Sequence, residues 1–554
     1  MYRRLLTVAI CMCLLVLTLT SCTQAVGNNK IEAGLNQYLN AMEKYRNFQG
    51  AVLVEKDGQI LVRAAYGMSD IEKNMKNKNS TKFPIGSVTK QFTTMAVMQL
   101  QEKGKLDVKD KLSKYMSDYP NGDKITIYNL MTHTSGIPNF PSASDITAFK
   151  TDDIKTEDCI NIFKNTPLDF EPGSKWSYCN SGYILLGYIV EKVSGLSLED
   201  YLIQNIFTPL KMDNTGVCYK NGVKKFDSNG YAGYLEAQPT GDETLLKVAF
   251  GAGYLYSTID DLAKWADALS SEKLVSKKTM DQIFKPYENT FTDGYYGFGW
   301  FVPENGKGEV HHGGNTAGFT SMMSVDFDKK LNVIILSNKG YADLTTVKST
   351  LTNIVLGEKY SVPEELTETS INSKDFGNYT GTYQSDKGLK IIISGDDKNF
   401  YAQLTGQGKA EIFPKSDTEF FYKKVDAQFT FVKDSGGLIK SLELNQNGQK
   451  ITANKISAET ELRKEIKIDP KIYDKYVGQY NATAGFTMTV TTEGDKIFAQ
   501  ITGQQKFEIF PESESSFFYK VVDAQIEFVK DSGGSVTEAV LKQAGQEFKM
   551  KKVK

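Results

Sequence analysis

The stretch Phe83-Pro84-Ile85-Gly86-Ser87-Val88-Thr89-Lys90 is the most informative part of this chain. Residues 91–100 follow it with apolar side chains at helical spacing, so we expect a helix to start at about Ser87. In a helix, Ser87 and Lys90 share one face, and the lysine side chain leans back toward the serine hydroxyl. The free N–H groups of a first turn also favour negative charge on an oxygen. The pattern therefore indicates a nucleophilic serine with an adjacent base.

A Ser-x-x-Lys pattern also has a purely structural explanation. The serine can cap the helix while the lysine is a solvated surface charge. The same pattern occurs at Ser270-Ser271-Glu272-Lys273, a polar stretch after an amphipathic segment that we expect at the surface. The other motifs of the chain must therefore decide between the two interpretations.

Composition excludes several classes of protein. The chain has 554 residues, 40% hydrophobic and 24% charged, which is typical of soluble globular protein in several domains. Its 65 basic and 67 acidic residues nearly balance, so we expect no nucleic-acid partner. Beyond the N-terminus only Cys159, Cys179 and Cys218 remain, without Cys-x-x-Cys spacing, and there is no His-Glu-x-x-His. We therefore expect no disulfide framework, no metal site and no cofactor.

The N-terminus has the pattern of a targeting segment. Two arginines precede the short apolar run Leu5–Leu19, so residues 1–21 are predicted to be a signal peptide. Leu19-Thr20-Ser21-Cys22 resembles the lipobox of bacterial lipoproteins, which implies cleavage before Cys22, lipidation of Cys22 and a tether over residues 22–30. A plain signal peptide or an uncleaved anchor is the alternative, although the run is short for a membrane span. We expect a lipid-anchored, extracytoplasmic protein of the bacterial cell envelope.

The first large domain is predicted over residues 31–360. Residues 31–45 have the spacing of an amphipathic helix, and Asp57-Gly58 is typical of a tight hairpin turn. Strands are expected at residues 50–56, 59–66, 318–325 and 332–337, and residues 296–300 are expected to start another strand. Residues 311–315 are expected to separate two of these strands. Strands at both ends, with helices between them, predict an α+β fold with one antiparallel sheet and helical layers.

The C-terminal third of the chain is repeated. After a polar linker at residues 361–376, Tyr401-Ala402-Gln403 corresponds to Phe498-Ala499-Gln500 at an offset of 498 − 401 = 97. The stretch Lys433-Asp-Ser-Gly-Gly437 recurs at Lys530 with the same offset. Short alternating runs with Gly and Asp at the turns predict two all-β units, each a small barrel or sandwich. We place them at residues 377–460 and 470–554.

Three motifs along the first domain stand in a characteristic order. Ser87-Val-Thr-Lys90, Tyr178-Cys-Asn180 and His312-Gly-Gly314 resemble the Ser-x-x-Lys, Tyr-x-Asn and His/Lys-x-Gly motifs of one family. That family is the serine hydrolases similar to class C β-lactamases, which includes penicillin-recognising DD-peptidases and esterases. The flanking phrases Leu130–Gly136, Glu171–Gly173 and Gly313–Phe319 also look like those of the family. The resemblance spans residues 31–357 and implies a β-lactamase-like fold.

The resemblance and elementary chemistry together assign the catalytic residues. Ser87 is the candidate nucleophile, and Lys90 and Tyr178 are a shared acid/base pair. A lysine serves as base only if burial or a neighbouring cation lowers its pKa, whereas a nearby ammonium would favour the tyrosine phenolate. Which of the two takes the first proton stays open, because the two groups titrate together.

Four further residues are assigned to substrate binding. The amide of Asn180 can hold Lys90 and the substrate. His312 stands where many relatives carry lysine, and a histidine is a cation only when protonated. The resemblance implies that histidine at this position is commoner in the peptidase and esterase branches, which argues against efficient β-lactam hydrolysis. The backbone N–H groups of Ser87 and Asn315 should form the oxyanion hole, and Gly314, like Gly313, would permit close approach of the substrate.

Other chemically capable side chains are expected to be structural. His133 is interpreted as a loop residue and His311 as a neighbour of the site. Cys179 should point away from Tyr178 and Asn180 and pack in the core. The three tryptophans are expected in the core as well.

The leading hypothesis is a serine hydrolase that acts through a Ser87 acyl-enzyme on amides or esters. Small peptides containing D-amino acids from the cell wall, or small esters, are the expected substrates. The alternatives are a β-lactamase and a catalytically idle protein that binds cell-wall fragments such as peptidoglycan through its repeats. The repeats could also fold over the cleft and select substrates by size.

Overall fold

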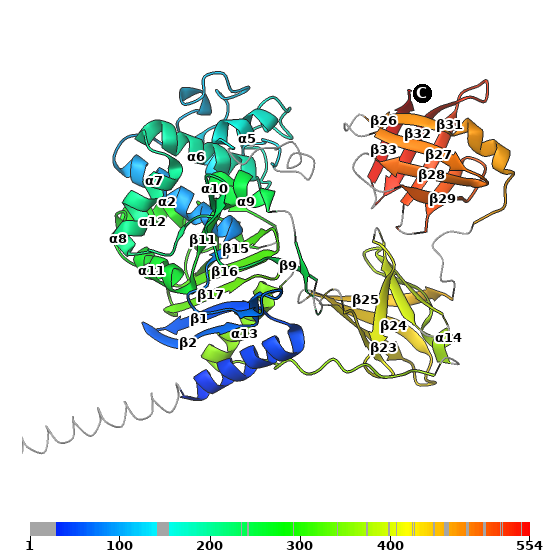
Figure 1. Cartoon of the computed structure of the whole chain (residues 1–554), viewed down its shortest axis with the longest axis horizontal. Helices are drawn as coiled ribbons and strands as arrows, with labels where there is room; N and C mark the ends of the chain where they lie inside the picture. Colours follow the sequence, from blue (N-terminus) through cyan, green and yellow to red (C-terminus); the bar gives the residue numbers. More distant parts are fainter. Residues whose placement is uncertain are drawn as a thin grey trace, which may run out of the picture. The chain divides into compact units, whose positions relative to one another are not determined.

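The computed structural model describes residues 29–140 and 154–553, apart from residues 234, 236, 241–242, 292, 341, 373–374, 397–398, 406, 424, 426, 447–448, 459–464, 483–486, 502–505, 521, 523 and 544–545. The predicted signal peptide and Cys22 lie outside the described residues. Residues 29 and 30, predicted to end the tether, are already helical. The chain divides into two compact units, Met1–Glu365 and Leu366–Lys554 (Figure 1).

An antiparallel sheet organises the first unit. Its strands follow one another in the order β12 (Glu288–Asn289), β13 (Tyr295–Tyr296), β14 (Phe301–Val302), β15 (Glu309–Thr316), β16 (Phe319–Asp326), β17 (Leu331–Ser337), β1 (Gly50–Lys56) and β2 (Gln59–Tyr66). The predicted hairpin is confirmed, because β1 pairs with β2 across Asp57 and Gly58, both at positive φ. The N-terminal strand pair therefore completes a sheet whose other strands come from much later in the chain.

Helices cover both faces of this sheet. On one face, residues 29–46 and α13 (Leu344–Leu356) pack their apolar stripes on side chains such as Val52 and Ile335. On the other face lie α11 (Ile259–Leu269) and the helical layer behind it (Figure 1). Further helices among the described residues of this unit include α3 (Ile127–Met131), α5 (Thr156–Phe163), α6 (Asn180–Ser194), α7 (Leu198–Leu202), α8 (Thr208–Leu210), α9 (Thr244–Val248), α10 (Phe250–Gly253) and α12 (Lys277–Ile283). This arrangement confirms the predicted α+β class.

The helix that follows Ser87, α2 (Thr89–Glu102), is the central element of the larger core. Its residues from Thr89 to Leu100 are all buried, including the polar ones. Phe92 packs on Trp265 with ring centroids 4.5 Å apart, and the Trp265 indole N–H donates to Gln91. A helix buried on all sides has a fixed position, so the groups at its N-terminus are held rigidly.

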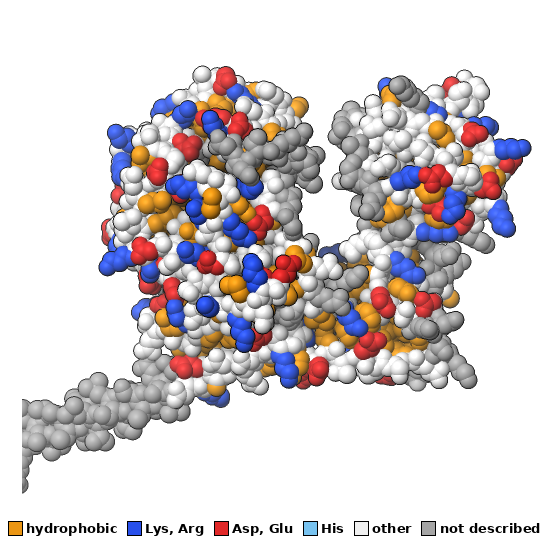
Figure 2. Space-filling view, in the orientation of Figure 1, with side chains coloured by type: hydrophobic (Ala, Val, Ile, Leu, Met, Phe, Trp, Pro, Cys, Tyr) orange, Lys and Arg blue, Asp and Glu red, His pale blue; other side chains and the backbone are white. Residues whose placement is uncertain are grey.

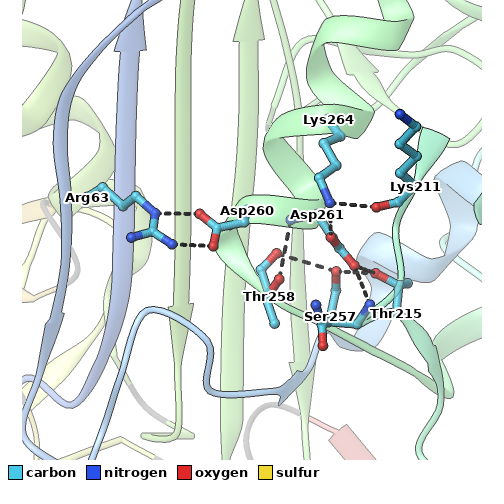
Figure 3. A network of polar contacts seen from close by, with 9 residues as sticks. Arg63, Lys211, Thr215, Ser257, Thr258, Asp260, Asp261 and Lys264 are labelled. Carbon is cyan, nitrogen blue, oxygen red and sulfur yellow. Dashed lines mark hydrogen bonds and ion pairs between the residues drawn. The ribbon is translucent and has the colours of Figure 1, made fainter.

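A polar network fixes the start of α11 (Figure 3). The Thr258 hydroxyl caps the helix by accepting from the Asp261 amide. The buried Asp261 carboxylate accepts from the Thr215 hydroxyl at 3.0 Å and from Lys264 at 2.8 Å. Outside the core, Arg63 of β2 pairs with Asp260 through both carboxylate oxygens. These contacts join α11 to the sheet and to the loop before β6 (Gly216–Val217).

The predicted position of residues 311–315 was wrong. We expected them between two strands, but His311, His312 and the two glycines lie inside β15 and pair with β16 along its whole length. Two adjacent glycines normally weaken a strand, which is why the pattern suggested a connection. Here they are required, because a Cβ on Gly314 would lie 2.1 Å from the Ile85 carbonyl oxygen.

The two repeats each form a closed eight-stranded antiparallel barrel, which settles the choice between barrel and sandwich. The first follows α14 (Phe376–Tyr379) and the second follows a 3₁₀ turn at Pro470–Lys475. The strands of the first are β18 (Gly381–Ser385), β19 (Lys390–Gly395), β20 (Phe400–Leu404), β21 (Ala410–Pro414), β22 (Glu419–Phe421), β23 (Ala427–Lys433), β24 (Ile439–Gln446) and β25 (Gln449–Ser457). Those of the second are β26 (Gly478–Ala482), β27 (Thr487–Glu493), β28 (Lys496–Ile501), β29 (Phe507–Pro511), β30 (Ser516–Tyr519), β31 (Ala524–Lys530), β32 (Val536–Gln543) and β33 (Gln546–Lys552).

Residues that precede the expected boundary of each repeat already contact its barrel. The Thr369 amide donates to the Pro414 carbonyl, and at the same offset of 97 the Ile466 amide donates to that of Pro511. Ile371 and Phe376 pack against the core of the first barrel. The polar composition of residues 361–376 hid these few apolar anchors, so the second half of the expected linker belongs to the first barrel.

The face of the molecule in Figure 2 carries basic and acidic side chains side by side, as the near balance of charge in the composition suggests. Within the described part of the chain, no helix combines the length and the apolar character needed to cross a bilayer.

Candidate active site

Ser87 lies on a short 3₁₀ turn, Gly86–Val88, which continues directly into α2. The helix start predicted near Ser87 is therefore confirmed. Just before it, β5 (Phe83–Pro84) pairs with β11 (Leu255–Ser257), and the Ile85 amide donates to the Leu255 carbonyl at 2.9 Å. Gly86 has a φ of 49°, which a side chain would disfavour. The small sheet and the buried helix thus hold the serine from both sides.

Lys90, one turn along, is completely buried with its amine at the serine. Its Nζ lies 3.0 Å from the Ser87 Oγ, 2.8 Å from the Asn180 Oδ1 and 2.8 Å from the Ala252 carbonyl oxygen. The amide oxygen and the carbonyl can only accept hydrogen bonds. A neutral amine that donates both its protons to these two acceptors therefore directs its lone pair toward the Ser87 hydroxyl.

Burial makes Lys90 a usable base. Desolvation lowers the pKa of Lys90 from its ordinary value to about 7. An amine with this pKa is substantially neutral near pH 7, which is the condition for accepting a proton from a hydroxyl.

Tyr178 lies beside the serine and the lysine. Ser87 is one of the groups that act on its phenol, and Lys90 Nζ lies 4.9 Å from the centre of its ring. Burial raises the pKa of Tyr178 well above its usual range, so the phenol keeps its proton. This differs from the expectation that Lys90 would favour the phenolate, because desolvation by burial is the largest effect on the phenol and disfavours its charged form. Of the two candidates, the geometry and the pKa shifts favour Lys90 as the first base.

His312, on β15, is buried and uses both ring nitrogens. Its Nδ1 lies 2.6 Å from the Gly313 carbonyl oxygen, to which only an N–H can donate, so Nε2 accepts from the Tyr296 hydroxyl 3.0 Å away. Burial, with Lys90 nearby, lowers the pKa of His312 to about 3. The ring centroid lies 6.2 Å from that of Tyr178. His312 therefore stands beside the site as a neutral group.

The two amides expected to form an oxyanion hole belong to segments in direct contact. A Cβ on Gly86 would lie 3.0 Å from the Asn315 amide nitrogen. The Ser321 hydroxyl donates to the Ile85 carbonyl at 2.8 Å and ties β16 to the same turn. The Asn315 side chain is engaged elsewhere, donating to the Gly340 carbonyl. Close approach of β15 to the serine turn thus depends on Gly314 and Gly86, and it brings the Asn315 backbone against that turn.

The other polar candidates lie outside the reacting centre. His311 pairs with Asp293 at 3.0 Å and stacks on Phe301. Cys179, like Cys159 and Cys218, is a buried free thiol, and its Sγ lies against the Ile137 carbonyl. Trp265 and Trp300 are core residues, whereas Trp176 is only partly buried. No group of His, Cys, Asp and Glu in the described ranges is arranged to hold a metal ion.

Sequence reasoning missed two members of the site. The Ala252 carbonyl holds Lys90, and the Tyr296 hydroxyl holds His312. Glycines flank Ala252 on both sides, a signal of close backbone approach, and a Cβ on Gly251 would indeed lie 2.7 Å from the Tyr183 carbonyl oxygen. The role of a backbone carbonyl does not depend on residue type, so the flanking glycines were the only sequence signal for the Ala252 carbonyl.

Comparison with known proteins agrees with this geometry. The beta-lactamase family model matches residues 35–353, and a domain of unknown function matches twice, at residues 367–455 and 462–554. The chain is 30% identical over 433 residues to penicillin-binding protein 4* of Bacillus subtilis, covering 73% of this chain and 94% of that protein. It thus belongs to the beta-lactamase and penicillin-binding protein family of serine hydrolases.

Solved structures support the same fold. The octameric penicillin-binding protein homologue from Pyrococcus abyssi superimposes with a TM-score of 0.54 at 26% identity, over 76% of this chain and 99% of that one. The D-amino acid amidase from Ochrobactrum anthropi SV3 has a TM-score of 0.50 at 22% identity, over 60% of this chain and 98% of its own. The β-lactamase-like fold predicted from three motifs is confirmed, and the protein is an enzyme of the serine hydrolase type.

Proposed function

We propose that this enzyme hydrolyses amides or esters through an acyl-enzyme on Ser87, at the outer side of a bacterial membrane. The observation that carries the proposal is the contact of Lys90 Nζ with the Ser87 Oγ at 3.0 Å, with the amine completely buried and its two other neighbours both acceptors. A serine hydroxyl is a weak nucleophile until a base removes its proton, and this arrangement supplies that base.

The geometry supports the following acylation step. The Ser87 Oγ attacks the substrate carbonyl carbon as its proton passes to Lys90, which becomes an ammonium with three acceptors around it. The developing oxyanion is held by the amides of Ser87 and Asn315. In this proposal Tyr178, kept protonated by burial and close to Ser87, gives its proton to the leaving group and regains one from Lys90. Water then attacks the ester of Ser87 by the reverse proton movements.

The neutral state of His312 bears on the choice of substrate. A cationic residue at this position would bind a substrate carboxylate, whereas His312 with both nitrogens engaged presents no charge. The preferred substrates in this proposal are therefore acyl compounds whose leaving group lacks a carboxylate, such as small esters and amides, including those of D-amino acids. Cell-wall peptides with a free terminal carboxylate, and β-lactams, would be poorer substrates.

Turnover of p-nitrophenyl acetate and covalent labelling by a fluorescent penicillin test the proposal on the soluble chain without its N-terminal 29 residues. Ser87→Ala should abolish both signals, while Ser270→Ala, in the exposed copy of the Ser-x-x-Lys pattern, should leave them unchanged. Mass spectrometry should find the acyl group on the peptide that contains Ser87. Undiminished turnover in Ser87→Ala would end the assignment.

Anchoring through a lipid on Cys22 is the second part of the proposal, and it rests on the lipobox-like sequence at residues 19–22. The full chain, expressed in a bacterium with fatty-acid labelling, should carry label in the membrane fraction. Cys22→Ser should lose the label, and Cys159→Ser should keep it. Equal labelling of the Cys22→Ser chain would refute lipidation at this residue.

A further inference from the structure

His133 is bound to the backbone on both sides of Tyr178. Its carbonyl accepts the Ser177 amide at 2.9 Å, and its ring Nδ1 accepts the Cys179 amide at 3.1 Å. A φ of 60° at His133 turns its carbonyl and its ring toward the same neighbouring segment. This left-handed conformation is uncommon for a residue with a side chain and is seen where the surrounding structure enforces it.

The same imidazole also packs on the Tyr178 ring. The two ring centroids are 4.3 Å apart, and His133 is 1% exposed. Tyr296 and Tyr183 lie against the imidazole as well, with centroid distances of 4.6 and 5.2 Å. Tyr296 is itself part of the wall of the site, because it holds His312. Tyr178 is thus fixed through its two flanking amides and through its ring by a single residue.

The hydrogen bond to Cys179 defines the state of the imidazole. A backbone amide can only donate, so Nδ1 carries no proton and the ring is neutral with its proton on Nε2. Burial lowers the pKa of His133 well below its usual value, and Lys90 lowers it further, so the acceptor is maintained over the working range of pH. A phenylalanine would keep the ring but lose the acceptor, and an asparagine would keep an acceptor close to the position of Nδ1.

We propose that His133 is a positioning residue that holds the Tyr178 phenol against Ser87. This inference rests on the proposed role of Tyr178 in acylation. His133 does not touch the reacting atoms, and its whole contribution passes through Tyr178. Displacement of a catalytic group by about 1 Å costs up to about a hundredfold in rate, so a loss of this contact should be measurable.

The test is a double-mutant cycle in the full soluble chain, read as the single-turnover rate of acylation by p-nitrophenyl acetate. H133F should slow acylation on the order of ten- to a hundredfold with substrate affinity nearly unchanged, while the strain at positive φ and the unpaired Cys179 amide lower the melting temperature. H133N, whose residue type tolerates positive φ, should recover most of the rate. In the Y178F background, H133F should change the rate by less than about twofold, because the residue through which it acts has lost its hydroxyl.

Three results would overturn the inference. H133F could acylate as fast as the parent, or it could cost the same factor with and without the Tyr178 hydroxyl, which would mean a role in general folding. If H133F does not fold, the acylation rates of H133N and H133Q are compared instead. Asparagine places its side-chain oxygen near the Nδ1 position, whereas the longer glutamine places it beyond that position. Equal acylation rates for these two variants would also refute the positioning role. Failure of the proposed role of Tyr178 can be distinguished from failure of this inference, because in the first case Y178F alone would leave acylation unchanged.

Discussion

At the scale of single residues, the site works by removing water from a lysine. The amine of Lys90 is held by Asn180 and Ala252, and its burial depresses its pKa to about 7 while that of Tyr178 is raised. In the proposed mechanism, the opposite pKa shifts of these two adjacent groups make Lys90 the proton acceptor and Tyr178 the proton donor. The Ser-x-x-Lys pattern predicted the pair, but the assignment of the first base needed the environment of each group.

The depressed pKa of Lys90 predicts a pH profile. Below a pH of about 7 the amine is protonated and cannot accept the Ser87 proton, so kcat/KM for p-nitrophenyl acetate should rise with pH through an apparent pKa of about 7. Measurement of kcat/KM between about pH 5 and 9, corrected for spontaneous hydrolysis, checks this. Lys103→Ala, an exposed lysine just after α2, is the control and should leave the profile unchanged. A profile flat over this range would contradict Lys90 as the base.

The neutral His312 predicts how charge at this position controls specificity. His312→Lys would place an ammonium where the parent has a neutral ring, so hydrolysis of acyl-D-alanyl peptides with a free carboxylate should improve relative to their amides. The ratio of kcat/KM for a peptide and its C-terminal amide is the measurement. His311→Lys, one residue earlier and outside the reacting centre, should leave the ratio unchanged. An unchanged ratio in His312→Lys would show that charge at this position does not determine the preference between peptides and their amides.

At the scale of elements, the site is the contact between a helix start and the middle of a strand. β15 can approach the turn Gly86–Val88 only because Gly314 has no side chain, since a Cβ there would meet the Ile85 carbonyl oxygen at 2.1 Å. The sequence predicted that glycines would allow close approach, but it placed them in a connection and in contact with the substrate. In the structure, Gly314 meets the enzyme's own backbone.

This contact predicts opposite outcomes for two adjacent substitutions. Gly314→Ala must push β15 away from the serine turn, so acylation should fall by about a hundredfold or more, the loss expected when an oxyanion donor is displaced. At Gly313 the nearest atoms to an added Cβ are 3.6 Å away, so Gly313→Ala should retain the fold and most of the activity. Acylation rates and melting temperatures of both variants test the prediction. Equal effects of the two substitutions would contradict it.

At the scale of the whole molecule, catalytic unit and repeats have separate cores. The buried side chains of the first unit form two clusters, and each barrel has its own cluster. Ser87, Lys90, Tyr178 and His312, with the groups that hold them, all belong to the first unit. We therefore expect the first unit to retain its hydrolase activity when the two repeats are removed.

A fragment of residues 30–365 tests this separation. It should fold and hydrolyse p-nitrophenyl acetate at a rate close to that of the soluble chain, because its cores and its site are complete. A shorter fragment that ends at residue 330 is the control and should not fold, since it lacks β17, in the middle of the sheet. Loss of small-ester hydrolysis in the longer fragment would show that the barrels contribute to the site itself, whereas a change confined to larger substrates would support selection by size.

The sequence by itself determined the features that arise from local order. These features are the hairpin around Asp57-Gly58, the helix after Ser87, the repeat of 97 residues and the order of the three motifs. Each can be predicted from neighbouring residues, through turn chemistry, periodicity or a motif. Tertiary structure alone decided which groups surround Lys90, how β15 meets the serine turn, that His312 is tied to Tyr296, and that His133 contacts Tyr178. These depend on burial and on contacts between segments far apart in the chain. The pKa of a buried side chain and the hydrogen-bond partner of a backbone carbonyl are both set by groups that only the folded chain brings near them.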